Sequence, residues 1–239
     1  AVPVKADDVW EFDAQRFVLN EYTGTETNVV VPDTMDDGVP VKRLGTQLLA
    51  GSETLTSVAV PDSVTILGSG ALSYDVNLSE ITLSSNLINI GWNAISSNDA
   101  LTELTIPASV CIIDSYAVSG CYALKKIVFE GACPLIGPEA FAMLSDDVVI
   151  YVPDDQIEEY KKVFEENNKY LNIQPSGKPA VLYSAEDYLD TENLTFDAET
   201  GSITGYNGMN TRLTIPESID GVPVKSIGER ALCEDPLLG

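Results

Sequence analysis

The chain has 239 residues, of which 44% are hydrophobic and 21% charged, so it can bury a sizeable core and is not a disordered chain. It carries 37 acidic and 13 basic residues, and a formal net charge of −24 repels phosphate backbones and anionic membranes, which argues against nucleic acid as a partner. The longest apolar runs fall well short of the roughly 20 residues of a membrane-spanning helix, so we expect no membrane insertion.

The first predicted element is a hairpin over residues 10–31, where apolar and polar residues alternate around turn residues. We expect this hairpin to cap the fold and to lead into a first coil. The preceding residues AVPVKADD contain no apolar stretch of the signal-peptide kind, so a signal peptide is either already removed or was never present.

A six-residue phrase then recurs every 23 residues: LGTQLL at 44–49, followed by LGSGAL, IGWNAI, IDSYAV and IGPEAF. A fixed period of this size is typical of a repeat architecture in which each unit buries its apolar side chains against its neighbours. Aligned on this period, four clean units begin at Leu55, Leu78, Leu101 and Leu124. The period predicts a right-handed, β-rich solenoid with coils over residues 29–153.

The positions within one unit predict which side chains point inward. Apolar side chains at positions 4 and 6 alternate with the residue at position 5, which indicates a strand whose positions 3 and 5 face outward. A proline often follows this strand. Positions 10 and 13 point back into the core, and position 17 is always alanine, where coils must approach closely. The glycine at position 14 is expected at positive φ, a conformation that its one replacement, Asp114, also tolerates.

The end of the array is predicted from a last strand at 148–153 and a helix at 154–168. Ile157, Tyr160 and Phe164 share one face of this helix, which would cover the open apolar end of the coils. Residues 1–173 would therefore form one array with its two caps.

A linker is predicted at 174–195, because QPSGKPA is a turn-rich stretch and the acidic residues after it are weakly patterned. Residues 196–228 then repeat the pattern of 12–45, including the phrase GVPVK in both copies. Residues 196–239 are therefore expected to begin a second array. Its apolar residues in 227–238 could support end-to-end self-association.

The unit LTELTIPASVCIIDSYAVSGCYA at 101–123 resembles the BspA-type leucine-rich repeat, and IDGVPVKSIG and YVPDDQIEEYKKVF resemble the family's entry and exit segments. The resemblance covers about 12–174 and 196–239 and implies a bacterial protein that is secreted or carried on the cell surface. The chain departs from the family pattern at position 21, where cysteine occurs only at Cys121, and the asparagine ladder of ordinary leucine-rich repeats is not visible.

Catalytic chemistry finds little support in the residues. Without histidine, a Ser–His or Cys–His pair is impossible, and no carboxylate pair has a distinctive sequence context. The acidic stretch DTMDDG at 33–38 lacks the alternating ligands of a calcium loop. Cys111 and Cys133 lie on adjacent coils, but Cys133 occupies a core column and is expected to be free. We therefore predict no enzymatic activity, no metal site and no cofactor.

The outward strand positions are the best candidates for binding, because solenoids usually bind along an exposed sheet. These candidates are Glu80, Thr82, Glu103, Thr105, Lys126 and Tyr151. Trp92 is a further candidate anchor on the far, loop-rich side, although packing over the neighbouring coil is the competing explanation. Stacked Glu80 and Glu103 would repel each other unless Lys126 or a cation relieves them.

The predicted function is a non-enzymatic, exported binding module that adheres to a protein or glycan on a host or neighbouring cell. Two alternatives remain open at this point. The chain could be a passive spacer that displays another domain, or an accessory region of a secreted hydrolase. An aromatic platform on one face would favour the second alternative, and a featureless strand face would favour the first.

Overall fold

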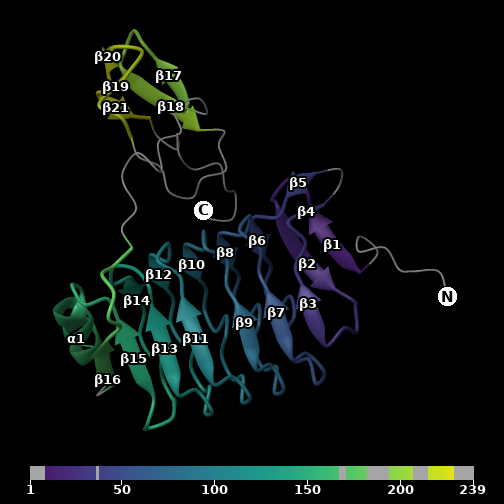
Figure 1. Ribbon diagram of the computed structural model, residues 1–239. Coiled ribbons are helices and arrows are strands. Elements are labelled where there is room, and N and C mark those ends of the chain that lie inside the picture. Colours follow the sequence, from purple (N-terminus) through teal and green to yellow (C-terminus); the bar gives the residue numbers. More distant parts are fainter. Residues whose placement is uncertain (1–8, 36–37, 167–170, 182–193, 207–214, 229–239) are drawn as a thin grey trace. The chain divides into compact units, whose positions relative to one another are not determined.

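The computed structural model describes residues 9–35, 38–166, 171–181, 194–206 and 215–228. The chain divides into two compact units, Ala1–Leu182 and Tyr183–Gly239, which are considered separately. The first unit is a stack of coils in which corresponding strands lie side by side (Figure 1). The predicted fold class, a solenoid of about 23-residue coils with one helix, is confirmed.

One side of the first unit is a seven-stranded sheet, which we call the back sheet. The antiparallel hairpin β1–β2 begins it, and parallel strands from successive coils continue it in the order β1-β2-β6-β8-β10-β12-β14. Its strands are β1 Trp10–Asp13, β2 Val18–Tyr22, β6 Arg43–Leu44, β8 Ile66–Leu67, β10 Asn89–Ile90, β12 Ile112–Ile113 and β14 Leu135–Ile136.

A second side, which we call the front sheet, is formed by parallel strands in the orders β3-β7-β9 and β11-β13-β15-β16. β9 and β11 lie next to each other in the stack (Figure 1). The strands are β3 Asn28–Val30, β7 Ser57–Ala59, β9 Glu80–Thr82, β11 Glu103–Ile106, β13 Lys126–Phe129, β15 Val149–Val152 and β16 Asn172–Pro175. A small hairpin joins the two sides near the start, with β4 Thr34–Met35 and β5 Val39–Pro40.

The third side of each coil, the turn side, contains two left-handed residues per coil, at positions 16 and 20. Between them, the position-18 amide of one coil donates to the position-17 carbonyl of the next at 2.8–2.9 Å, as from Leu72 to Ala94. The residues with positive φ are Gln47, Gly70, Asn93, Tyr116 and Glu139 at position 16, and Gly51, Tyr74, Ser97, Gly120 and Met143 at position 20.

The prediction that position-14 glycine has positive φ is wrong, because the left-handed residues lie two and six positions later. These glycines are needed for a different reason. A Cβ on Gly68 would lie 2.5 Å from the carbonyl oxygen of Leu44, to which the Gly68 amide donates at 2.7 Å. Glycine at position 14 therefore avoids a close contact between a Cβ and the carbonyl of the neighbouring coil, although the bond itself does not require glycine. Asp114 still makes the equivalent bond to Ile90, at 2.9 Å.

The core lies between the three sides and consists of the predicted apolar columns. Leucine at position 1 and alanine at position 17 are almost completely buried in every clean unit, with at most 2% of each side chain exposed. Because the same column repeats in each coil, each buried side chain packs against its counterparts above and below.

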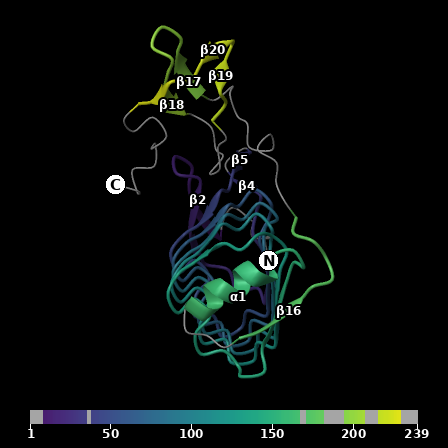
Figure 2. The ribbon, with the colours of Figure 1, turned by 90° about the vertical axis from the view of Figure 1, so that its left-hand side faces the viewer.

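The helix α1 (Ile157–Glu166) lies across the last coil (Figure 2). Tyr160 and Phe164 are buried, and their rings lie 4.9 Å from Phe129 and 5.5 Å from Phe141, between ring centroids. The Tyr160 hydroxyl donates to the carbonyl oxygens of Gly131 and Ala132 at 3.2 and 3.3 Å. The helix therefore closes the apolar end of the core.

The structure differs from the predicted linker at its start. Asn172–Pro175 form β16, which pairs in parallel with β15, so the front sheet extends into residues assigned to the linker. The chain after it also bonds to the array, since the amide of Val181 donates to the Glu130 carbonyl at 2.9 Å. Pro175 and Gly177 predict an irregular chain, whereas in the structure Pro175 ends an edge strand.

The second unit repeats the beginning of the first. Its hairpin β17–β18 has a register shift like that of β1–β2, and β18 pairs in parallel with β21 as β2 does with β6. The strands are β17 Leu194–Asp197, β18 Ser202–Tyr206, β19 Ser218–Ile219, β20 Val222–Pro223 and β21 Ser226–Ile227. Residues 182–193 of the predicted linker and 229–238 of the predicted self-association segment lie outside the described residues.

Candidate functional site

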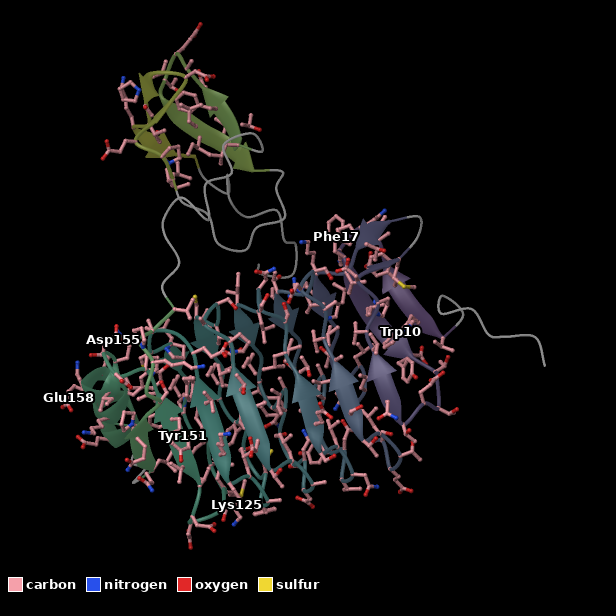
Figure 3. All side chains as sticks on the ribbon, viewed as in Figure 1. Trp10, Phe17, Lys125, Tyr151, Asp155 and Glu158 are labelled. Atoms are coloured by element: carbon pink, nitrogen blue, oxygen red, sulfur yellow. The ribbon has the colours of Figure 1, made fainter. Side chains whose placement is uncertain are left out.

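The front sheet brings six of the seven predicted binding residues onto one surface. Its parallel register aligns Glu103 with Lys126, and Thr105 with Val128 and Tyr151. Glu80 and Thr82 lie on the adjacent strand β9, at the same alternation of outward and inward side chains. We call this surface the front face; Figure 3 shows Tyr151 among the side chains of this sheet. The front face consists of Glu80, Thr82, Glu103, Thr105, Lys126, Val128 and Tyr151.

The front face carries one ion pair, because Lys126 Nζ lies 2.9 Å from Glu103 Oε2. About two thirds of the Glu103 side chain remains exposed, so water screens this pair and its contribution to stability is small. Lys126 therefore relieves the repulsion that Glu103 and Glu80 would otherwise share. A neighbouring lysine outside the face, Lys125, forms an ion pair with Asp147 and also donates to Ser145. The Lys125 ammonium lowers the pKa of Asp147 to about 2.

The remaining candidate, Trp92, is not on the front face. It occupies position 15 of its coil, on the turn side, and about half of its side chain is exposed. Tyr74, Tyr116 and Tyr122 are also exposed on this side of the coils. The sequence-predicted residues therefore belong to two separate surfaces.

A buried polar column was missed in the sequence. At position 21, the amide of Ser52 donates to Asp75 Oδ1 at 2.7 Å, and the amide of Asp75 donates to Asn98 Oδ1 at 3.0 Å. The Asn98 side-chain amide donates to Leu72 and Ile95, and Cys121 Sγ lies 3.2 Å from the Ile95 carbonyl oxygen. A side-chain ladder that the sequence analysis did not predict is thus present at position 21, built from Ser, Asp, Asn and Cys and not from a column of asparagines.

The buried titratable groups lie in packed columns. Burial raises the pKa of Asp75 to about 7, that of Cys121 to about 11 and that of Cys133 to about 12. The two thiols are therefore protonated at neutral pH, and both are free, as is Cys111. In the part of the chain that the structure describes, no three His, Cys, Asp or Glu side chains gather as a metal site. The arrangement offers hydrogen bonding, charge and aromatic surface for recognition.

A search of curated proteins found no match. Among solved structures, a leucine-rich repeat protein from Bacteroides capillosus is 34% identical over 51% of this chain and 93% of its own, with a TM-score of 0.44. A leucine rich cell surface protein from Faecalibacterium prausnitzii is 23% identical over 60% of this chain and 42% of its own, with a TM-score of 0.38. No helix among the described residues is both long and apolar enough to cross a bilayer.

The family model described as "BspA type Leucine rich repeat region" matches residues 40–171 with six copies. These residues make up more than half of the chain, and they include most strands of the back and front sheets, from β6 to β15, together with the turn side. The chain belongs to the BspA-type leucine-rich repeat family.

Proposed function

We propose that the chain is an adhesion module that binds a protein on a host or neighbouring cell through its front face. Such modules act outside the cell, so we also propose that the protein is secreted or held on a bacterial surface. The observation that supports this proposal most is the surface of β9, β11, β13 and β15, whose outward side chains are exposed on β9 and β11 and half-exposed on β13 and β15. On the last three strands, charged, hydroxyl and aromatic groups stand in register.

The composition of the front face suits a protein partner. Thr82, Thr105, Val128 and Tyr151 provide a flat surface with little charge, and the carboxylates and Lys126 lie beside it. An uncharged centre with charged groups around it is the usual arrangement of protein interfaces. The exposed Glu80 carboxylate and the net charge of −24 would favour a partner with a basic patch and would accelerate its association at low salt.

The test is binding of the purified chain to extracellular-matrix proteins and mucins by biolayer interferometry. We expect saturable binding to at least one of them, and a loss of about ten-fold or more in affinity, or about 1.4 kcal/mol, in the Glu80→Lys and Glu103→Lys variants. The charge-matched control is Glu53→Lys, because Glu53 is exposed but lies outside the front face.

Two results would contradict the proposal. Equal losses in Glu103→Lys and Glu53→Lys would mean that overall charge, not the front face, governs binding. An absence of binding across the whole panel would favour the alternative that the array is a spacer displaying another domain.

A further inference from the structure

The turn side carries exposed aromatic side chains on three successive coils. Tyr74, Trp92, Tyr116 and Tyr122 are 55%, 51%, 40% and 61% exposed. None of the ring contacts found among the described residues involves these four side chains, which distinguishes them from the core rings around Phe129. We call this group the aromatic row.

Hydrogen bonds place the two central members on neighbouring coils. The amide of Asn93, which follows Trp92, donates to the carbonyl of Ser115, which precedes Tyr116, at 3.3 Å. The peptide units beside the two aromatic residues are therefore stacked directly, one coil apart. Tyr74 is connected to the same coil as Trp92, because its amide donates to the carbonyl of Ser96 at 3.0 Å.

Two members of the aromatic row occupy left-handed positions. Tyr74 has φ 63° and Tyr116 has φ 61°. The equivalent positions of other coils hold glycine in some cases, as at Gly70 and Gly120, and other residues in the rest, such as Gln47 and Met143. A side chain with a Cβ destabilises this conformation relative to glycine. Glycine would therefore make these coils more stable, and it is already compatible with the turn. Because non-glycine residues outside the aromatic row share this conformation, the strain alone does not mark a site, but it makes the two tyrosines testable by replacement with glycine.

The surroundings indicate the chemistry of a ligand. Asn93 and Ser115, which lie beside Trp92 and Tyr116, are neutral hydrogen-bonding groups, whereas Glu139 is acidic and occupies the position of Tyr116 in the next coil. The chain's negative charge opposes sulfated or uronic acid polymers. Separate, half-exposed rings flanked by amide, hydroxyl and carboxylate groups suit an uncharged ligand with alternating apolar faces and hydroxyl edges.

We propose that the aromatic row binds a neutral oligosaccharide, with sugar rings stacked on Trp92 and Tyr116. The site is distinct from the front face and lies on another side of the coils. It does not depend on the protein partner proposed above. Rigid aromatic rings suit this role, because they supply a large contact area at a low cost in side-chain entropy.

The test is a titration of the full chain with neutral polysaccharides (galactomannan, mixed-linkage β-glucan, arabinoxylan) and anionic ones (heparin, polygalacturonate). The chain has two tryptophans, and Trp10 is buried, so a change in tryptophan fluorescence reports mainly on Trp92. Affinity electrophoresis provides a second readout. We expect saturable binding of at least one neutral polymer and a Trp92→Ala variant that binds about ten-fold more weakly.

The decisive variants are Tyr116→Gly and Tyr74→Gly. If the rings contact sugar, these variants bind more weakly and yet unfold at a higher urea concentration, because the left-handed strain is removed. A merely structural role would leave sugar binding unchanged, and that result would overturn the proposal. It would also be overturned by preferential binding of the anionic polymers, or by no binding of any neutral one.

The front-face variant Glu103→Lys separates this proposal from the proposed function. It should bind the polysaccharide as the unmodified chain does. A loss of sugar binding in Glu103→Lys would place the sugar on the front face and overturn the aromatic-row site. Loss of protein binding alone would leave the two sites independent, as we infer.

Discussion

Asp75 is fully buried in the polar column at position 21, where its two carboxyl oxygens have different surroundings. Oδ1 accepts from the Ser52 amide, whereas Oδ2 is buried without a hydrogen-bond partner. In the next coil, the corresponding atom of Asn98 is an N–H donor to the carbonyls of Leu72 and Ile95. Backbone carbonyl oxygens, which accept hydrogen bonds, thus face this atom of the position-21 side chain. A protonated carboxylic acid or an amide can donate to them, whereas a carboxylate cannot.

We therefore predict that Asp75→Asn stabilises the protein at neutral and basic pH. Burial raises the folded-state pKa of Asp75 from 3.8 to about 7, so the folded state binds a proton that the unfolded state has lost. The free energy of unfolding should fall as pH rises from about 4 to about 7, by up to ~4 kcal/mol, and then level off. Urea denaturation followed by circular dichroism at pH 4.5, 6 and 8 measures this change.

The comparison of the two proteins isolates Asp75 from the other carboxylates. The gap in unfolding free energy should be small at pH 4.5 and largest at pH 8, where Asp75 must be buried as an anion. A gap of the same size at every pH would show that Asp75 does not titrate between the folded and unfolded states as described.

Gly68 provides a second prediction at this scale. Its missing Cβ would lie 2.5 Å from the Leu44 carbonyl oxygen, so Gly68→Ala must push two coils apart and should cost about 2–3 kcal/mol. Gly51→Ala is the matched control: φ is 77°, but nothing lies within 4 Å of the added Cβ. Its cost should be only about 1 kcal/mol of left-handed strain. Equal costs in thermal or urea unfolding would refute the close-approach explanation.

At the scale of elements, α1 should contribute strongly to the stability of the last coils. Phe164 is 2% exposed and packs against Phe141, so we expect Phe164→Ala to destabilise the array by about 3–5 kcal/mol. Glu165→Ala, an exposed change one residue along the same helix, should be nearly neutral. If both variants melt at the same temperature as the unmodified chain, α1 is not the cap of the core.

The sequence predicted the parts of each coil whose residue types are constrained. Leucine at position 1 and alanine at position 17 recur because each must fill or fit the same space in every coil, and outward positions 3 and 5 followed from the alternation. The left-handed positions 16 and 20 were not recognised, because they hold residues as different as Gln47, Tyr116 and Met143. Their conformation is imposed by hydrogen bonds between coils, which no single residue type marks.

The candidate sites also divide into residues that the repeat pattern predicts and residues that it did not reveal. Front-face residues could be predicted, since they follow from the strand period. The column of Ser52, Asp75 and Asn98 could have been found by reading position 21 downward for polar side chains. The strand β16 could also have been found, because each of its residues lies 23 positions after its partner in β15, although a helix occupies the coil between the two strands.

At the scale of the whole molecule, each coil contacts mainly its neighbours, so opening should begin at the ends. Native-state hydrogen exchange should show the slowest amides in the central coils, including Leu72 and Ile95, each bonded to the next coil at 2.8 Å. Leu49, in the first full coil, should exchange faster although its bond to Ala71 is similar, at 2.9 Å. Identical opening free energies at all three amides would mean that the array unfolds as a single cooperative unit.

The constant register between coils also determines how such a molecule can grow. Asn89 pairs with Ile66 on one side and with Ile112 on the other, each exactly one period away, so residues 78–100 form a module that its two neighbours would accept again. A tandem copy of this segment should lengthen both sheets by one strand, about 4.8 Å, without a new kind of contact. An insertion one residue shorter or longer would expose the apolar columns of every later strand up to the next turn. An array of this architecture can therefore grow or shrink only by complete coils of 23 residues.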